Sequence, residues 1–495
     1  MDKRIWILLL FLALFLIGLR MVMNYKRSEQ ESRILYATFP FLSSVGDRFL
    51  DSTNLQNVSD YYLLENLSIG LLRDDPADEN EYEPALAQSW KEIDSKTWVF
   101  YLRPDLKWSN GSPITASELT NGFLRFRGIE SRHLRLLPHL ESVRFDEASR
   151  ALFFHFDRPV YDEILHELSL ADAVLLHPEN IKGNWSITSG PYSLEKWDQT
   201  NERIHLRGNP YCPLFKDGSP RNVILYTGHS VEEITKLFLE IPDDLFPINP
   251  WQLHPVYQSL LSHAPSKLIG IPNYISYFCF TGNDVLFNNE EARVEFEAFV
   301  HEALSQVLPT YYDQMIPPGF AGHLDSNWVT MMASSRDFKL LKTKTIWLNL
   351  PKPYQYFPEF EKALVDHAKA FGIDLRIAYQ LFPTEKPDHD YFAEVRFFKG
   401  NQRDALGTWN FLFSKTGALA RFKDKMAPDL ERISMIQEEA ERILALKAFH
   451  ESVLRHAYAI PFRVDPTTML ISERVDLSRW NRFDMRDRYY DVRWR

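Results

Sequence analysis

Cysteine and histidine, the residues that most often carry catalysis or bind metals, occur here without the spacing that either chemistry requires. The two cysteines, Cys212 and Cys279, are too few for a zinc site and could form at most one disulfide. Cys279 lies in an apolar run, so a buried thiol is the favoured role and a disulfide is the alternative. Among the scattered histidines, His133 and His139 are close in sequence but lack a carboxylate or thiol at ligand spacing. We therefore expect no metal site.

Signatures of the common enzyme classes are missing as well. The sequence has no Gly-x-Gly-x-x-Gly after a strand, no phosphate loop ending in Gly-Lys-Ser/Thr, no His-Glu-x-x-His and no Gly-x-Ser-x-Gly elbow. The common catalytic signatures are therefore absent, and we predict no catalytic residues and no cofactor. An extracytoplasmic hydrolase whose site is assembled from distant residues is the alternative.

The length and the charge narrow the class of protein further. A chain of 495 residues predicts about three compact units. The net charge of -11, with no cluster of Lys and Arg, counts against a nucleic-acid partner. An aromatic share of 14% suits a ligand groove, although thick hydrophobic cores use the same residues.

The amino-terminal segment has the charge order of an export signal. Lys3 and Arg4 precede residues 5–23, which are apolar apart from Gly18 and Arg20. No small-residue cleavage pattern follows, and Leu19 stands where a lipoprotein signal would have its lipidated cysteine. We expect residues 1–27 to form an uncleaved signal anchor that holds the globular part outside the cytoplasm; a cleaved signal peptide is the alternative.

Hydrophobic periodicity predicts a mixture of strands and helices. Residues 97–103 read as a strand, and Thr115 to Glu118 fit a capping box at the start of a helix. Apolar side chains recur at helical spacing over residues 357–368 and then alternate with polar ones over 373–379, which predicts a helix followed by a strand. A long helix is expected over about 429–457. This mixture indicates α/β lobes.

Several of these segments carry a family resemblance. They read EPALAQSW at 83–90, TWVFYLRPDLKWSNGSPITASEL at 97–119, SGPYSLEKW at 189–197, HLRGNPY at 205–211, and the closing AYAIPF and YYDVRWR. In this order they resemble extracytoplasmic solute-binding protein family 5, which includes the oligopeptide- and dipeptide-binding proteins of bacterial ABC importers. The resemblance spans roughly residues 34–495.

The resemblance implies an α/β, two-lobed periplasmic-binding-protein type II clamp with an additional domain, which makes three discontinuous domains. Its expected boundaries are 28–50, 188–265 and 466–495 for lobe I, 51–187 for the additional domain and 266–465 for lobe II. The implied function is capture of a peptide-like solute by a monomer that presents it to the membrane subunits of an importer. A membrane-anchored receptor or scaffold with the same fold is a further alternative, and the family also includes binders of nickel complexes, haem and oligosaccharides.

The resemblance also implies a ligand-binding residue. In peptide-binding members, a Gly-Trp-x-x-Asp segment places a carboxylate against the α-amino group of the peptide, and here Gly400 to Asp404 correspond to it. Asp404 falls on the carboxylate position, but Asn401 replaces the tryptophan. Arg403 adjoins Asp404 and could neutralise it, so a structural role for Asp404 is the alternative. Trp409 is expected either to supply an aromatic wall or to lie in the core.

Overall fold

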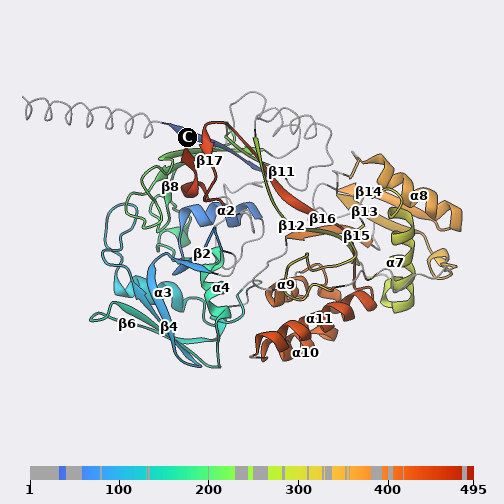
Figure 1. Ribbon diagram of the computed structural model, residues 1–495, viewed down its shortest axis with the longest axis horizontal. Coiled ribbons are helices and arrows are strands. Elements are labelled where there is room, and N and C mark those ends of the chain that lie inside the picture. Colours follow the sequence, from blue (N-terminus) through green and yellow to red (C-terminus); the bar gives the residue numbers. More distant parts are fainter. Residues whose placement is uncertain are drawn as a thin grey trace, which may run out of the picture.

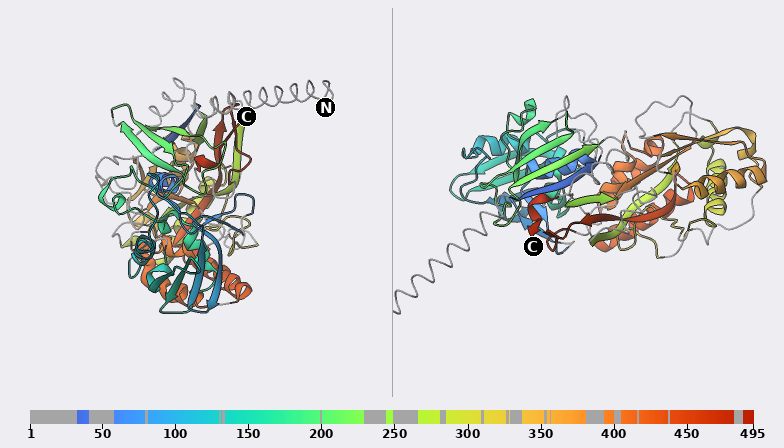
Figure 2. Two further views of the ribbon diagram at one scale, coloured as in Figure 1. Left: turned by 90° about the vertical axis from the view of Figure 1, so that its left-hand side faces the viewer. Right: turned by 90° about the horizontal axis from the view of Figure 1, so that it is seen from above.

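Two separate hydrophobic cores organise the chain (Figure 1). The computed structural model describes residues 33–40, 58–78, 81–129, 131, 134–198, 200–228, 244–248, 266–280, 285–308, 311–325, 328, 337–351, 354–355, 357–380, 393–399, 405–415, 417–436, 438–481 and 488–495. The first core takes its residues from Leu35 to Leu245 and again from Met469 to Trp494. The second core takes its residues from Ile275 to Phe462. Viewed from above, the two bodies lie side by side along the long axis (Figure 2).

A ten-stranded sheet extends through both cores. Its strand order is β14-β13-β15-β12-β16-β11-β1-β10-β9-β8. The strands are β1 (Ile34–Pro40), β8 (Tyr192–Asp198), β9 (Arg203–Gly208), β10 (Asn222–Gly228), β11 (Leu245–Ile248), β12 (Ser266–Cys279), β13 (Ile346–Pro351), β14 (Leu375–Gln380), β15 (Ala393–Lys399) and β16 (Ala459–Ile471). The long strands β12 and β16 lie near the middle of this order. They therefore join the part of the sheet that packs in the first core to the part of the sheet that packs in the second.

The first core also contains a smaller antiparallel sheet and three helices. The small sheet has the order β4 (Ala87–Asp94), β5 (Thr97–Leu102), β7 (Ala151–Phe156) and β6 (Leu140–Asp146). The remaining elements are α2 (Val58–Leu67), α3 (Ala116–Leu124), α4 (Glu163–Ser169), and the strand pairs β2 (Leu72–Asp74) with β3 (Tyr82–Pro84) and β17 (Val475–Asp476) with β18 (Arg493–Trp494). The predicted capping box is confirmed at the start of α3: Glu118 N–H donates to Thr115 Oγ1 at 3.2 Å, and Thr115 N–H donates to Glu118 Oε2 at 2.8 Å.

The second core is covered by α7 (Glu290–Leu304), α8 (Pro358–Phe371), α9 (Ala405–Leu412), α10 (Lys423–Ser434) and α11 (Glu439–Arg455). Single 3-10 turns lie at Leu137–His139, Ala171–Ala173, Asn180–Lys182, Leu286–Asn288, Leu341–Thr343, Ala420–Phe422 and Tyr489–Asp491. The predicted helix-to-strand unit is confirmed as α8 followed by β14, and Gly372 ends the helix with a φ of 70°.

The prediction of a single long helix over 429–457 is wrong. The chain forms two helices there, because α10 ends at Ser434 and α11 begins only at Glu439. Glu438 has extended backbone angles, φ -74° and ψ 119°, which interrupt the helical path. The interruption lets α10 and α11 pack against each other.

Both cysteines are buried free thiols, which confirms the favoured reading of Cys279. Burial raises the pKa of the Cys212 thiol to about 12, so this group stays protonated and unreactive at neutral pH. The expected anchor over residues 5–23 lies outside the described residues and stays a prediction. Within the described part of the chain, no helix combines the length and apolar character needed to span a membrane.

His450 is a buried neutral histidine whose two ring nitrogens are both engaged. Met315 N–H donates to Nε2 at 3.0 Å, which leaves Nδ1–H to donate to the Gly322 carbonyl at 3.0 Å. Burial lowers the pKa of His450 to about 3. Protonation would break the bond from Met315, so the neutral tautomer is part of the fold.

This histidine should make the second core sensitive to acid. The pKa of His450 is lower in the folded than in the unfolded chain. Its contribution to the free energy of unfolding is therefore complete above about pH 6.5 and is lost as pH falls toward 3. Between pH 7 and pH 5 the loss should be about 2 kcal/mol. Denaturant titrations at both pH values should show this loss in the wild type and a loss smaller by that amount in His450→Gln. Equal losses in the two proteins would contradict the assignment.

Candidate functional site

The chain passes between the two cores through a two-stranded ribbon. It leaves the first core in β12 and returns in β16, and these strands pair along their length. The ladder is irregular where the ribbon lies between the cores, with register shifts between Ile269 and Pro272 and again before Tyr274. Pro272 faces Pro466 across the ribbon, and neither proline can donate a backbone hydrogen bond. The weakened ladder makes this the expected point of bending.

The parallel strands of the two lobes converge on the space between them. β12 runs from the first core toward the second; β1 and β11 run the same way, since β16 is antiparallel to both β12 and β11. β15 is antiparallel to β12, and β13 and β14 run parallel to β15. The two sets therefore run toward each other, so their carboxyl ends face the boundary between the lobes. Ligands of open α/β sheets bind outside the carboxyl ends of the strands.

The segments that follow these carboxyl ends include residues 41–57, 229–243, 249–265, 381–392 and 400–404, and all of them lie outside the described residues. The last contains the predicted site residues Asn401, Arg403 and Asp404. In the chain this segment connects β15 to α9. The roles of these three residues stay predictions.

Trp409, the fourth predicted site residue, is described and is fully buried. Its ring packs against Phe413, Phe449 and His450, with ring centroids 6.2, 5.3 and 5.5 Å away. It therefore lies in the second core, which was the alternative for this residue. Its role as a ligand wall stays a prediction.

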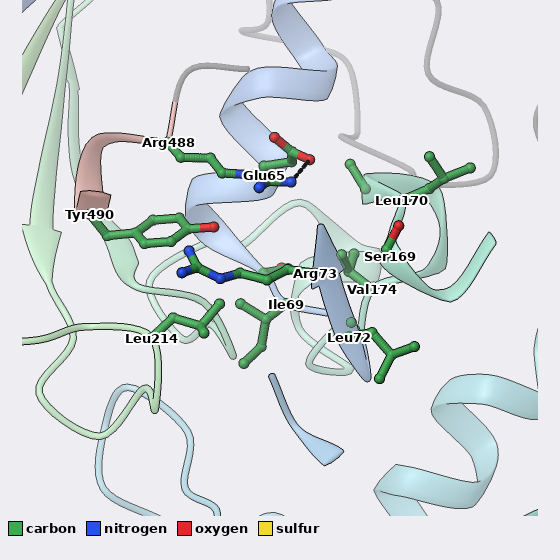
Figure 3. Close-up of a pocket in the computed structure, with 13 residues that line it drawn as sticks. Glu65, Ile69, Leu72, Arg73, Ser169, Leu170, Val174, Leu214, Arg488 and Tyr490 are labelled. Carbon is green, nitrogen blue, oxygen red and sulfur yellow. Dashed lines mark ion pairs between the residues drawn. The ribbon is translucent and has the colours of Figure 1, made fainter. Parts of the chain in front are cut away.

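A buried charge cluster that no sequence pattern predicted lies in the first lobe. Figure 3 shows its arginines, Arg73 and Arg488, together with Glu65. Arg73 on β2 donates through Nη1 to both carboxylate oxygens of Asp491, at 3.1 and 3.0 Å, and through Nε to Glu83 at 2.8 Å. The Tyr490 ring lies 5.4 Å from the Arg73 guanidinium. Arg73 and Asp491 are 6% and 3% exposed, so the pair is removed from water.

A second buried arginine extends this cluster. Arg488 lies 3.2 Å from the Asp74 carboxylate and 3.6 Å from Glu65 on α2. Ser169 Oγ donates to the same Asp74 carboxylate at 3.0 Å. The cluster ties residues 488–494 to β2, α2 and the end of α4.

The cluster borders a narrow crevice that is partly open to solvent (Figure 3). Aliphatic side chains such as Leu72, Leu170 and Val174 form the rest of its wall. The arginines beside it already have carboxylate partners, so the cluster is suited to fixing chain segments. Residues that pair in this cluster are up to 418 positions apart in the sequence. The sequence signal that could have revealed it is the presence of charged residues beside apolar and aromatic ones, in LLRDD at 71–75 and RYYDVRW at 488–494. No three described His, Cys, Asp or Glu residues are grouped as a metal site.

The two lobes and their shared sheet form an α/β fold of the periplasmic-binding-protein type II class. Residues 81–223 match the family model of bacterial extracellular solute-binding proteins, family 5. The periplasmic oligopeptide-binding protein OppA of Salmonella typhimurium is 25% identical over 242 residues, which are 40% of this chain and 44% of OppA. The matched part is thus less than half of that curated relative.

Solved structures have a similar fold over nearly the whole length of this chain. A dipeptide-binding protein from Pseudoalteromonas sp. SM9913, in complex with Met-Leu, has a TM-score of 0.75 at 14% identity and covers 94% of this chain and 100% of its own. AgaA from A. tumefaciens R10, in complex with agropinic acid, has a TM-score of 0.70 at 14% identity and covers 94% and 99%. At these identities the likeness shows the fold alone. Together with the sequence matches, it confirms the resemblance to solute-binding protein family 5.

Proposed function

We propose that this protein captures a peptide-like solute between its two lobes outside the cytoplasm and presents it to an ABC-type importer. The observation that carries the proposal is the convergence of two sets of strand carboxyl ends on one interlobe space, with a proline-weakened ribbon beside it. Such a site binds by burial and hydrogen bonding. Relatives named as oligopeptide-binding proteins support a solute-binding role.

The finer parts of the proposal rest on the sequence. Asp404 is proposed to receive the α-amino group of a peptide, and residues 5–23 are proposed to hold the protein at the membrane. The domain boundaries given above, with lobe II over 266–465, are part of the same proposal. The fold does not select the ligand, since the same class of fold is seen with a dipeptide and with agropinic acid.

Ligand binding should raise the melting temperature and compact the molecule. A ligand present at 100 times its dissociation constant stabilises the folded state by about 2.7 kcal/mol. A thermal-shift screen of dipeptides to pentapeptides should identify such a ligand, and X-ray scattering of the protein with that peptide should show a smaller radius of gyration than without it. A verified tight ligand that leaves the radius of gyration unchanged would favour a rigid receptor over a closing clamp.

A further inference from the structure

An ion pair joins the two lobes at a point outside the connecting ribbon. Arg442, in the first turn of α11, contacts the carboxylate of Glu163, the first residue of α4. Helix α4 packs in the first core through Ile164 and Leu168, whereas α11 packs in the second core through Leu446. The pair therefore connects two bodies that, in the described part of the chain, are linked through β12 and β16.

Both partners are held by their own lobe. Arg442 Nη1 also donates to the Ile436 carbonyl at 3.2 Å, between α10 and α11, which fixes the guanidinium to the second lobe. Glu163 lies on a helix whose residues 164–169 are all buried. The two side chains are 21% and 29% exposed, so the contact is partly shielded from water. A rotation of one lobe about the ribbon would separate these two charges.

We propose that Glu163 and Arg442 form an electrostatic latch that favours the closed arrangement of the lobes. Figure 1 shows α4 and α11 on the same side of the β12–β16 ribbon. The contribution of one partly exposed ion pair is small. A small term still changes the populations of two states when those states differ little in free energy. The latch sets how often the site is open to a solute.

The inference rests on the proposed function, since it assumes that the lobes open and close. Its test uses the full chain without any ligand. Spin labels attached through Ala148→Cys, in the exposed turn between β6 and β7, and Glu431→Cys, on the exposed face of α10, report the distance between the lobes. The native thiols are buried and do not compete for the label.

The ratio of open to closed populations should rise roughly two- to fivefold in Glu163→Gln and in Arg442→Gln, and in the wild type at 1 M salt. The double variant Glu163→Arg with Arg442→Glu should recover part of the closed population. Asp325→Asn is the matched control, because it removes the Lys447–Asp325 pair, 2.8 Å long, which lies within the second lobe. This control should keep the wild-type ratio.

The distance measurements distinguish a failure of the proposed latch from a failure of the proposed function. Two distance populations that none of the substitutions shifts would overturn the latch and leave the proposed function intact. A single distance population in every protein would overturn the latch, because no open and closed states would exchange without ligand. If the distance also stays the same when a peptide found in the thermal-shift screen is added, the proposed closure on a solute is overturned as well. A melting curve recorded for each variant shows whether it folds, and unfolding of both single variants would assign the pair to the fold and overturn the latch.

Discussion

Replacing Arg73 by methionine should lower the free energy of unfolding by about 3 to 5 kcal/mol, the cost of leaving one partner of a buried ion pair without the other. Methionine fills similar space along β2 but removes the charge. Asp491 would keep its position in the first core without the two hydrogen bonds that Arg73 donates. Denaturant titration followed by near-ultraviolet circular dichroism, which reports the surrounding tyrosines and tryptophans, measures the change.

Two variants make this expectation specific. Arg73→Met combined with Asp491→Asn leaves no unpaired charge at position 491, so it should be more stable than Arg73→Met alone. Asp325→Asn breaks an ion pair whose carboxylate is 88% exposed, and it should cost less than about 1 kcal/mol. If Arg73→Met and Asp325→Asn cost the same, the buried cluster does not hold the first lobe together.

The second large effect concerns ligand binding. If the Asp404 carboxylate meets the α-ammonium group of a peptide, Asp404→Asn should weaken peptide binding by about 2 to 5 kcal/mol, because the variant keeps the shape and removes the charge. Acetylating the amino terminus of the peptide should weaken binding to the wild type by a similar amount and should change binding to the variant very little.

Isothermal titration of both proteins with both peptides gives the coupling energy in one cycle. A coupling energy near zero, with the two losses simply adding, would mean that Asp404 does not face the amine. The proposal of a solute-binding clamp would survive that result, because it rests on the strand topology, but the peptide would lose its residue-level support.

Local signals in the sequence were sufficient for several elements. The strand-like stretch 97–103 predicted β5, the Thr115 to Glu118 spacing predicted the start of α3, and helical spacing ended by Gly372 predicted α8. Each depends on residues a few positions apart, whose side chains share one face or one hydrogen-bonded turn. The same reasoning failed at 435–438, because hydrophobic spacing continues through the interruption between α10 and α11 while the backbone does not.

The sequence by itself therefore determined several of the local elements, the buried state of Cys279 and, through dispersed motifs, the family resemblance. Tertiary structure alone decided which distant charges meet, namely Arg73 with Asp491 and Glu163 with Arg442. It also decided the direction in which the strand ends of each lobe point. Neither ion pair has a sequence spacing that any local rule describes, since the partners are 418 and 279 residues apart along the chain. Charged side chains pair wherever the folded backbone brings them together, and that juxtaposition is a property of strand order and lobe packing.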